Sequence, residues 1–219
     1  MSKSYYVDRN HPEYGIFESD ELVKALKADA KGDILQFSVE ELLVALGSSS
    51  KASNKVEVSD ANTSVSEKYL KYDYVVFSDG GSSPSSGGPG GYGAVVINCK
   101  TGETTELSNG YKATTNNRME ILGAATGLNA VPDGASAILI SDSQYVINTM
   151  SLGWKRDANN DLWVKLDAAV EGKKSVDFLH VKGHENGKTF ESKWNNRCDA
   201  LSKEARKKPV LEEDAGFDK

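Results

Sequence analysis

The sequence contains few of the residues that build disulfide-rich or zinc-binding proteins, and it has no long apolar run. Of its 219 residues only two are cysteine and three are histidine. Cys99 and Cys198 belong to no CxxC pair, so we expect two reduced thiols and neither a disulfide framework nor a zinc site. No segment approaches the roughly 18–20 apolar residues that span a membrane. The sequence therefore predicts a protein with no membrane partner.

The sequence also lacks an excess of basic residues. Lysine and arginine number 26 against 32 aspartates and glutamates, which gives a formal net charge of −6. Phosphate contacts usually come from lysine and arginine. Because these residues are not in excess, we expect no part of the chain to be a strongly basic nucleic-acid-binding module. A carboxylate cluster that binds cations would account for some of the acidity. Residues 1–15 lack an export signal, so we expect an intracellular protein, cytoplasmic if bacterial or phage.

What the chain does contain suits a globular protein, with 38% hydrophobic and 26% charged residues. Short apolar segments in residues 1–46 predict a small α+β domain. Residues 47–68 are rich in serine, asparagine, threonine and lysine, and this composition is typical of a flexible linker. Residues 69–208 form the main domain, and residues 209–219 an acidic tail.

The main domain alternates apolar segments with turn residues in a regular order. Three strands come first, and strands then alternate with helices, which predicts an α/β domain with a five-stranded mixed sheet flanked by helices. We expect strands at 72–77, 92–98, 103–111, 137–140 and 176–181, and helices at 116–130, around 145–150, around 162–170 and at 194–205.

Four acidic residues of this domain occupy similar positions relative to the expected elements. Asp79 and Asp142 each follow a strand, Glu120 lies early in a helix, and Asp199 lies in the opening half of the last helix. If the two strands are neighbours, both aspartates face one cleft beyond the strand ends. Taken singly, each acid is equally well explained as a solvated surface residue or a helix cap. Together they would repel, and hard divalent cations such as Mg²⁺ relieve such repulsion.

Six segments of the main domain resemble type 1 ribonuclease H, in the family's order and at compatible spacing over residues 72–205. They are YVVFSDGG (74–81), GGPGGYGA (87–94), TNNRME (115–120), SDSQYV (141–146), VKGH (181–184) and NNRCDALS (195–202). The resemblance implies the ribonuclease H-like fold and an endonuclease that hydrolyses the RNA strand of RNA–DNA hybrids, leaving 5′-phosphate and 3′-hydroxyl ends. The competing interpretation is a non-catalytic hybrid-binding or scaffolding protein that kept the fold.

The resemblance also implies roles for individual residues. Asp79, Glu120, Asp142 and Asp199 match the catalytic acids that bind two Mg²⁺ ions, with Mn²⁺ as a substitute, in a two-metal-ion mechanism. His184 matches a catalytic histidine of a flexible loop that assists proton transfer or product release. The implied partner is an RNA–DNA hybrid, with no small-molecule cofactor, and we expect a monomer.

Other positions match the family's substrate contacts. Asn116, Asn117 and Gln144 match residues that line the minor groove of the hybrid, where the 2′-hydroxyl distinguishes RNA from DNA. Thr115 and Arg118 match positions near the DNA-strand backbone and the protein core, and for Arg118 a phosphate contact and a structural ion pair remain equally open.

A short cluster at 153–156 stands where many relatives carry a longer basic extension. Trp154 and Lys155 could stack on the DNA strand and neutralise it, or they could be a helix-capping aromatic and a solvated charge. Residues 1–46 faintly resemble the small hybrid-binding domain attached to many cellular enzymes of this family. Asp20 stands where that domain usually has tryptophan, and binding of hybrid, binding of protein and an inert remnant all stay open.

Overall fold

The computed structural model describes residues 65–83, 87–183 and 186–217, and the backbone of three short strands that precede them. The chain divides into two compact units, residues 1–53 and 54–219. The strands of the first unit are β1 (Tyr5–Asp8), β2 (Ile16–Phe17) and β3 (Ile34–Phe37). Their order in the sheet is β2-β1-β3, and the central strand β1 pairs antiparallel with the other two. The helices expected in residues 1–46 lie outside the described residues.

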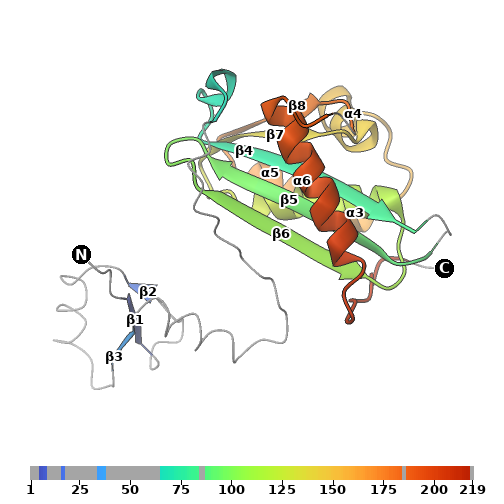
Figure 1. Ribbon diagram of the computed structural model, residues 1–219, viewed down its shortest axis with the longest axis horizontal. Coiled ribbons are helices and arrows are strands. Elements are labelled where there is room, and N and C mark those ends of the chain that lie inside the picture. Colours follow the sequence, from blue (N-terminus) through green and yellow to red (C-terminus); the bar gives the residue numbers. More distant parts are fainter. Residues whose placement is uncertain are drawn as a thin grey trace. The chain divides into compact units, whose positions relative to one another are not determined.

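The second unit is built on a five-stranded mixed sheet, as the sequence predicted, and its strand order is β6-β5-β4-β7-β8 (Figure 1). The strands are β4 (Tyr74–Ser82), β5 (Gly90–Asn98), β6 (Thr104–Tyr111), β7 (Ser136–Ser141) and β8 (Ser175–His180). Neighbours β4, β5 and β6 pair antiparallel, whereas β4, β7 and β8 pair in parallel. The central strand β4 therefore connects the antiparallel half of the sheet to the parallel half.

Helices cover both faces of this sheet. The helices are the short 3-10 helix η1 (Glu67–Tyr69), α3 (Asn116–Asn129), α4 (Gln144–Leu152), α5 (Asn160–Glu171) and α6 (Phe190–Ala205). Figure 1 shows α6 crossing one face, while α3 and α5 lie against the other. No helix in the described ranges is long and apolar enough to cross a membrane.

The side chains of β4 alternate between two hydrophobic cores, as expected for a strand with helices on both faces. Val75 and Phe77 belong to the core beneath α6, whereas Val76 belongs to the core formed with α3, α4 and α5. All three side chains are fully buried. Trp163 and Trp194 are buried on opposite faces of the sheet, one in each core.

Two element boundaries differ from the prediction by more than two residues. β4 was expected to end before Asp79 but runs on to Ser82, because β5 continues to pair with it after the parallel pairing with β7 has stopped at Phe77. α6 begins at Phe190 and not at Trp194. Its extra turn starts with a reciprocal capping box between Thr189 and Ser192, which satisfies backbone donors at the helix start.

The acidic tail packs against the sheet domain. Glu212 forms a parallel bridge with Tyr111 at the end of β6, donating its N–H to the Gly110 carbonyl and accepting from the Lys112 N–H, both at 2.9 Å. The tail then reaches the start of α3, where Asp214 accepts a hydrogen bond from the Thr114 hydroxyl at 2.7 Å. Residues 212–214 are thus connected to the segment that leads into α3.

Candidate active site

Asp79 and Asp142 lie next to each other because their strands are adjacent and parallel. Phe77 on β4 pairs with Ile140 on β7, and each aspartate comes two residues later in the same direction. By strand alternation Asp79 faces α6, the helix that carries Asp199. The sequence-based expectation that these two acids share one end of the sheet therefore holds in the structure.

Two glycines let the helices with the other two acids approach the sheet closely. A Cβ on Gly80 would lie 2.3 Å from the backbone nitrogen of Glu120, so α3 approaches β4 as closely as the backbones permit. A Cβ on Gly93 would lie 2.3 Å from the carbonyl oxygen of Cys198, the residue before Asp199. The glycines thus bring Glu120 and Asp199 to the strands from opposite faces.

The four acids influence one another electrostatically. The pKa of Asp79 is raised to about 7, mainly by burial and also by the negative charges of the other three carboxylates, while a 2.8 Å hydrogen bond from the Gly80 N–H opposes the shift. Burial likewise raises the pKa of Glu120 to about 7, with a smaller contribution from Asp142, and the hydroxyl of Ser143 opposes the shift. Raised carboxylate pKa values of this kind are typical of functional sites that concentrate negative charge.

Each carboxylate is also oriented by a neighbouring donor. Asn195 donates its amide N–H to Asp142 at 3.1 Å, and Lys203 contacts Asp199 at 2.6 Å. Ser143 donates its hydroxyl to Glu120, as the Gly80 N–H donates to Asp79. In each contact the donor engages one carboxylate oxygen, which fixes the carboxylate in the way that outer-shell partners of metal ligands do.

The donor set fits a hard divalent cation. Its atoms are all carboxylate oxygens, the ligands that Mg²⁺ prefers, and half-burial of four like charges is relieved by a cation. Within the described ranges no three side chains of histidine, cysteine, aspartate or glutamate form a ready-made metal cluster. The carboxylates instead point toward their individual donors. Both cysteines are free thiols.

The comparisons identify the family to which this arrangement belongs. The family model for RNase H matches residues 71–207, the segment that contains all four acids and the whole sheet. The chain belongs to the RNase H family. Enzymes of this family hydrolyse the RNA strand of RNA–DNA hybrids with divalent metal ions, and the protein is therefore an RNA–DNA hybrid endoribonuclease.

Individual proteins of the RNase H family are similar to this chain over about the same segment as the family model. Ribonuclease H of Syntrophus aciditrophicus is 41% identical over 158 residues, which cover 65% of this chain and 86% of that protein. Ribonuclease HI of Synechocystis is 39% identical over 158 residues, covering 66% and 94%. The N-terminal RNase H domain of a Mycobacterium tuberculosis protein, solved as a fusion with maltose-binding protein, matches with a TM-score of 0.52 at 26% identity, covering 62% and 94%.

The residues expected to contact the hybrid lie at the starts of α3 and α4. Thr115 caps α3 by accepting a hydrogen bond from the Arg118 N–H, and Asn116 and Asn117 follow it in exposed positions. The Asn116 amide oxygen accepts from the N–H and the hydroxyl of Ser82 at 2.6 and 2.9 Å, which turns its NH₂ group away from that loop. Gln144 is exposed at the start of α4. His184 lies outside the described residues.

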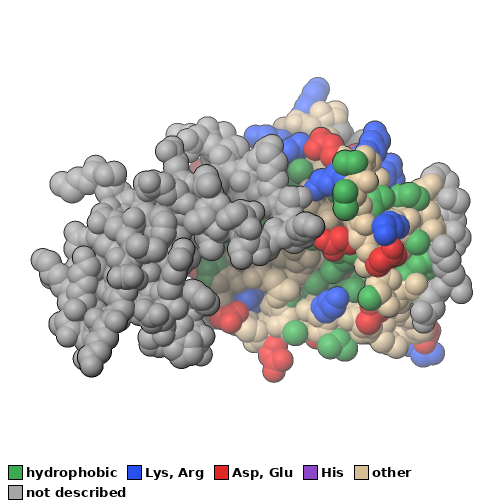
Figure 2. Space-filling model, turned by 90° about the horizontal axis from the view of Figure 1, so that it is seen from below, with side chains coloured by type: hydrophobic (Ala, Val, Ile, Leu, Met, Phe, Trp, Pro, Cys, Tyr) green, Lys and Arg blue, Asp and Glu red, His purple; other side chains and the backbone are tan. Residues whose placement is uncertain are grey.

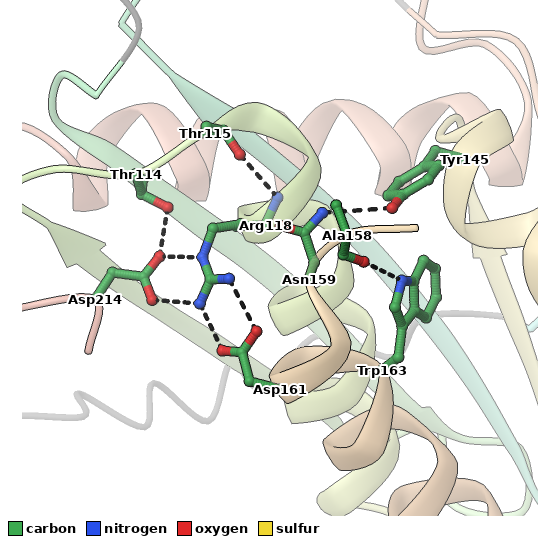
Figure 3. A network of polar contacts seen from close by, with 9 residues as sticks. All are labelled: Thr114, Thr115, Arg118, Tyr145, Ala158, Asn159, Asp161, Trp163 and Asp214. Atoms are coloured by element: carbon green, nitrogen blue, oxygen red, sulfur yellow. Dashed lines mark hydrogen bonds and ion pairs between the residues drawn. The ribbon is translucent and has the colours of Figure 1, made fainter. Parts of the chain in front are cut away.

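For Arg118 the structure favours the ion-pair interpretation over a phosphate contact. The residue is only 3% exposed, and its guanidinium makes two hydrogen bonds to Asp161 at 2.9 and 2.7 Å and two to Asp214 at 2.7 Å (Figure 3). These bonds raise the pKa of Arg118 and keep it charged. A guanidinium that is buried and satisfied in this way acts as a structural link in the RNase H domain.

The short cluster near Trp154 divides between the surface and the interior. Trp154 is 47% exposed, and Lys155 is exposed with an ion pair to Asp157 at 2.6 Å. Arg156 turns inward instead, stacking over Trp163 at 4.9 Å and pairing with Asp167. Two side chains of the cluster therefore remain available to a ligand. Figure 2 shows acidic and basic side chains interspersed on the described part of one face.

Sequence reasoning did not find the residues that orient the acids. Asn195 precedes Asp199 by one helical turn, and Ser143 follows Asp142 directly, so proximity in sequence to an acid was the available signal. Asp214 carried no such signal, because its partner Arg118 lies 96 residues earlier. His180 is exposed, and its Nε2 lies 3.1 Å from the Asp142 carbonyl oxygen.

Proposed function

We propose that Asp79, Glu120, Asp142 and Asp199 are the catalytic acids of this RNase H and that they bind two Mg²⁺ ions. One observation carries the proposal. Four elements that are distant in sequence direct four half-buried carboxylates toward one end of the sheet, where they raise the pKa of Asp79 together. A bound divalent cation offsets such repulsion, and Mn²⁺ should substitute for Mg²⁺.

The residues have different roles in the reaction. Bound ions would activate the attacking water and stabilise the leaving oxygen, which yields 5′-phosphate and 3′-hydroxyl ends. Asp79 is the most strongly perturbed acid and is held by the Gly80 N–H, so it provides the fixed centre of the acidic cluster. We assign proton transfer or product release to His184, which follows Gly183 in the chain.

Substrate selection follows from neutral amides. Asn116, Asn117 and Gln144 are exposed beside the acids, and amides can donate to and accept from base edges and ribose hydroxyls without requiring one sequence. Thr115 presents the loop before α3 to the DNA strand, and Trp154 and Lys155 offer a stacking surface and a charge. These residues predict binding that selects the hybrid by its shape and 2′-hydroxyls. We further expect the protein to act as a monomer and to need no small-molecule cofactor.

A cleavage assay tests the assignment against the alternative of a non-catalytic hybrid-binding protein. Labelled RNA–DNA hybrid, double-stranded RNA and duplex DNA are incubated with the full chain, with Mg²⁺ or with a chelator. We expect cleavage of the RNA in the hybrid alone, dependence on the metal, and loss of activity in Asp79→Asn. The matched control is Asp133→Asn, an exposed aspartate paired with Lys173. Hybrid bound but uncut by the wild type would establish the alternative.

For residues 1–46 we propose a hybrid-binding module connected by the linker at 47–68. A connected module raises the local concentration of hybrid at the acids and favours repeated cuts. Deletion of residues 1–53, the first compact unit, tests this. We expect weaker hybrid binding and fewer cuts per encounter. Unchanged affinity and processivity would leave a protein-binding role or an inert remnant.

A further inference from the structure

Residues 211–217 of the acidic tail cross over the buried ion pair that joins α3 to α5. They lie outside the segment 71–207 that the RNase H family model matches. A Cβ on Gly216 would lie 2.1 Å from the Asp161 Oδ2 and 2.6 Å from the Arg118 Nη2, so the backbone of the tail lies directly against this ion pair. The tail is thus a closely packed addition to the part of the chain that the family model matches.

Phe217 brings a half-buried aromatic ring to the turn between β4 and β5. Its N–H donates to the Asp214 carbonyl at 2.9 Å, which closes a turn in the tail. The described atoms that a Cβ on Gly87 would meet are two carbons of the Phe217 ring, at 3.3 and 3.4 Å. The ring therefore lies against the side of Gly87 on which any other residue would carry its Cβ.

The turn that Phe217 covers is costly to hold in one conformation. Four of the five residues 87–91 are glycine, and Gly87 has a φ of 76°. Glycine loses more conformational freedom on ordering than any other residue. Contacts from outside the turn are therefore needed to keep it ordered.

The acidic tail supplies such contacts at two places. The Thr114 N–H donates to the Gly88 carbonyl at 3.1 Å, which fixes the turn to the loop before α3. Thr114 is fully buried, and its hydroxyl donates in turn to Asp214 at 2.7 Å (Figure 3). The tail thus holds the turn indirectly through Thr114 and directly through Phe217.

The turn lies next to residues that we propose to contact the hybrid. Thr115 and Asn116 follow Thr114 directly. The hairpin that contains the turn also carries Ser82, whose N–H and hydroxyl donate to the Asn116 amide oxygen at 2.6 and 2.9 Å. A shift of the turn therefore changes the orientation of an amide that faces the substrate.

We propose that Phe217 is a positioning residue for the hybrid, which keeps the glycine-rich turn seated on Thr114 before the substrate arrives. The proposal rests on the proposed function, which places the hybrid at the start of α3. Without the ring the turn becomes ordered only on binding, and this entropic cost weakens the affinity for the hybrid. Chemistry at the acids is unaffected, because Asp79 lies within the paired part of β4.

Three variants of the full chain separate positioning from a general effect of the tail. Phe217→Ala removes the ring, whereas Phe217→Leu keeps an apolar side chain over Gly87. Val210→Ala is the matched control, because Val210 is also an apolar residue of the acidic tail but is 82% exposed.

The affinity for a labelled RNA–DNA hybrid is measured by fluorescence anisotropy with a chelator, and KM and kcat are measured with Mg²⁺. Phe217→Ala should raise Kd and KM about five-fold with kcat unchanged, as expected when ordering is moved to the binding step. Phe217→Leu should recover most of the affinity, and Val210→Ala should change neither constant. Unchanged Kd and KM in Phe217→Ala, or an equal loss in Val210→Ala, overturns the inference.

Hydrogen exchange of the Thr114 N–H reports on the turn directly, because its acceptor is the Gly88 carbonyl. Exchange should be faster in Phe217→Ala, whereas the Cys99 N–H, which donates to the Asp73 carbonyl beyond the opposite end of β5, should exchange as in the wild type. Equal acceleration at both sites would indicate a general loss of stability and overturn the positioning role. Failure of the wild type to cut a hybrid that it binds overturns the proposed catalysis alone, since Kd and the exchange rates still test Phe217.

Discussion

Asp79 on β4 is paired across the sheet with Gly93 on β5, and the missing side chain of Gly93 is the reason that α6 can lie so close to Asp79. A Cβ at that position would meet the Cys198 carbonyl oxygen at 2.3 Å and the Leu201 Cβ at 2.6 Å. Backbone cannot move aside as a flexible side chain can. A glycine without any chemistry of its own therefore sets how closely the helix that carries Asp199 approaches Asp79, two of the four acids proposed as catalytic.

Substitution of this glycine should impair both stability and catalysis. Gly93→Ala forces α6 away from β5, and we expect a loss of about 1–3 kcal/mol in the free energy of unfolding together with a loss of kcat. The matched control is Gly81→Ala on β4, where the nearest heavy atom to the new Cβ would be 3.7 Å away. Chemical denaturation and hybrid cleavage measure both. Wild-type kcat in a folded Gly93→Ala variant would show that the approach of α6 does not matter.

Removal of one acid should abolish cleavage and raise the thermal stability of the metal-free protein. Asp79→Asn eliminates a charge that three other carboxylates repel, so in the presence of a chelator we expect Tm to rise by about 3 °C or more while cleavage is lost. Asp133→Asn removes a surface charge that lies outside the cluster and should leave activity intact. Thermal unfolding of the chelated proteins measures the shift. A lower Tm for Asp79→Asn than for wild type would contradict strong repulsion among the acids.

Divalent metal should stabilise the folded protein. A ligand that binds the native state alone raises stability by an amount that grows with the logarithm of its concentration. We therefore expect Tm of the wild type to increase steadily as Mg²⁺ is titrated into chelated protein, and Mn²⁺ to act at lower concentrations. In Asp142→Asn the increase should be strongly reduced. A metal-independent Tm in the wild type would argue against binding at the four acids.

Ser143 should matter to catalysis through Glu120. Its hydroxyl donates to the Glu120 carboxylate and also accepts from the Val146 N–H at 3.3 Å as the cap of α4. Ser143→Ala should cost about 1 kcal/mol of stability for the cap and should lower kcat more than it raises KM. Ser143→Thr retains the hydroxyl and should recover most of kcat. If Ser143→Thr recovers stability but not kcat, the contact with Glu120 plays no part in catalysis.

The order of elements and the four acids were predictable from the sequence because both leave local signals. Apolar periodicity marked each strand and helix, and short motifs marked each acid. The continuation of β4 to Ser82 was not predictable in this way, since it depends on pairing with a glycine-rich strand that has little apolar pattern. The Arg118 network was equally hidden, because an ion pair between residues far apart in sequence leaves no periodic signal.

The same network should make stability depend on acid pH. Hydrogen bonds from Arg118 lower the pKa of Asp161. Burial raises the pKa of Asp214, but hydrogen bonds from Arg118 and Thr114, together with the charge of Arg118, lower it overall. A lowered carboxylate pKa contributes stability that is complete above the unfolded value, near 3.9, and is lost as pH falls through the folded value. We therefore expect the contribution of this network to the free energy of unfolding to be constant near neutrality and to fall steeply below about pH 4.

Neutralising Asp214 tests the origin of this dependence. Asp214→Asn leaves the buried Arg118 with one carboxylate, and we expect a loss of about 3 kcal/mol at pH 7 with a shallower acid transition. Glu213→Gln is the control, because Glu213 is exposed and its ion pair with Lys112 is worth little. Denaturant titrations at several pH values measure both. Equal behaviour of the two variants would assign the acid transition to other groups.

The separation of 96 residues between Arg118 and Asp214 affects the order in which the domain can fold. A ribosome releases the chain from its N-terminus, so Arg118 emerges well before Asp214 does. Until then the guanidinium has Asp161 as its partner and lacks half of its hydrogen bonds. The full set of hydrogen bonds around Arg118, and with it the contact between α3 and the segment at Asp214, therefore forms only after a further 96 residues have been synthesised.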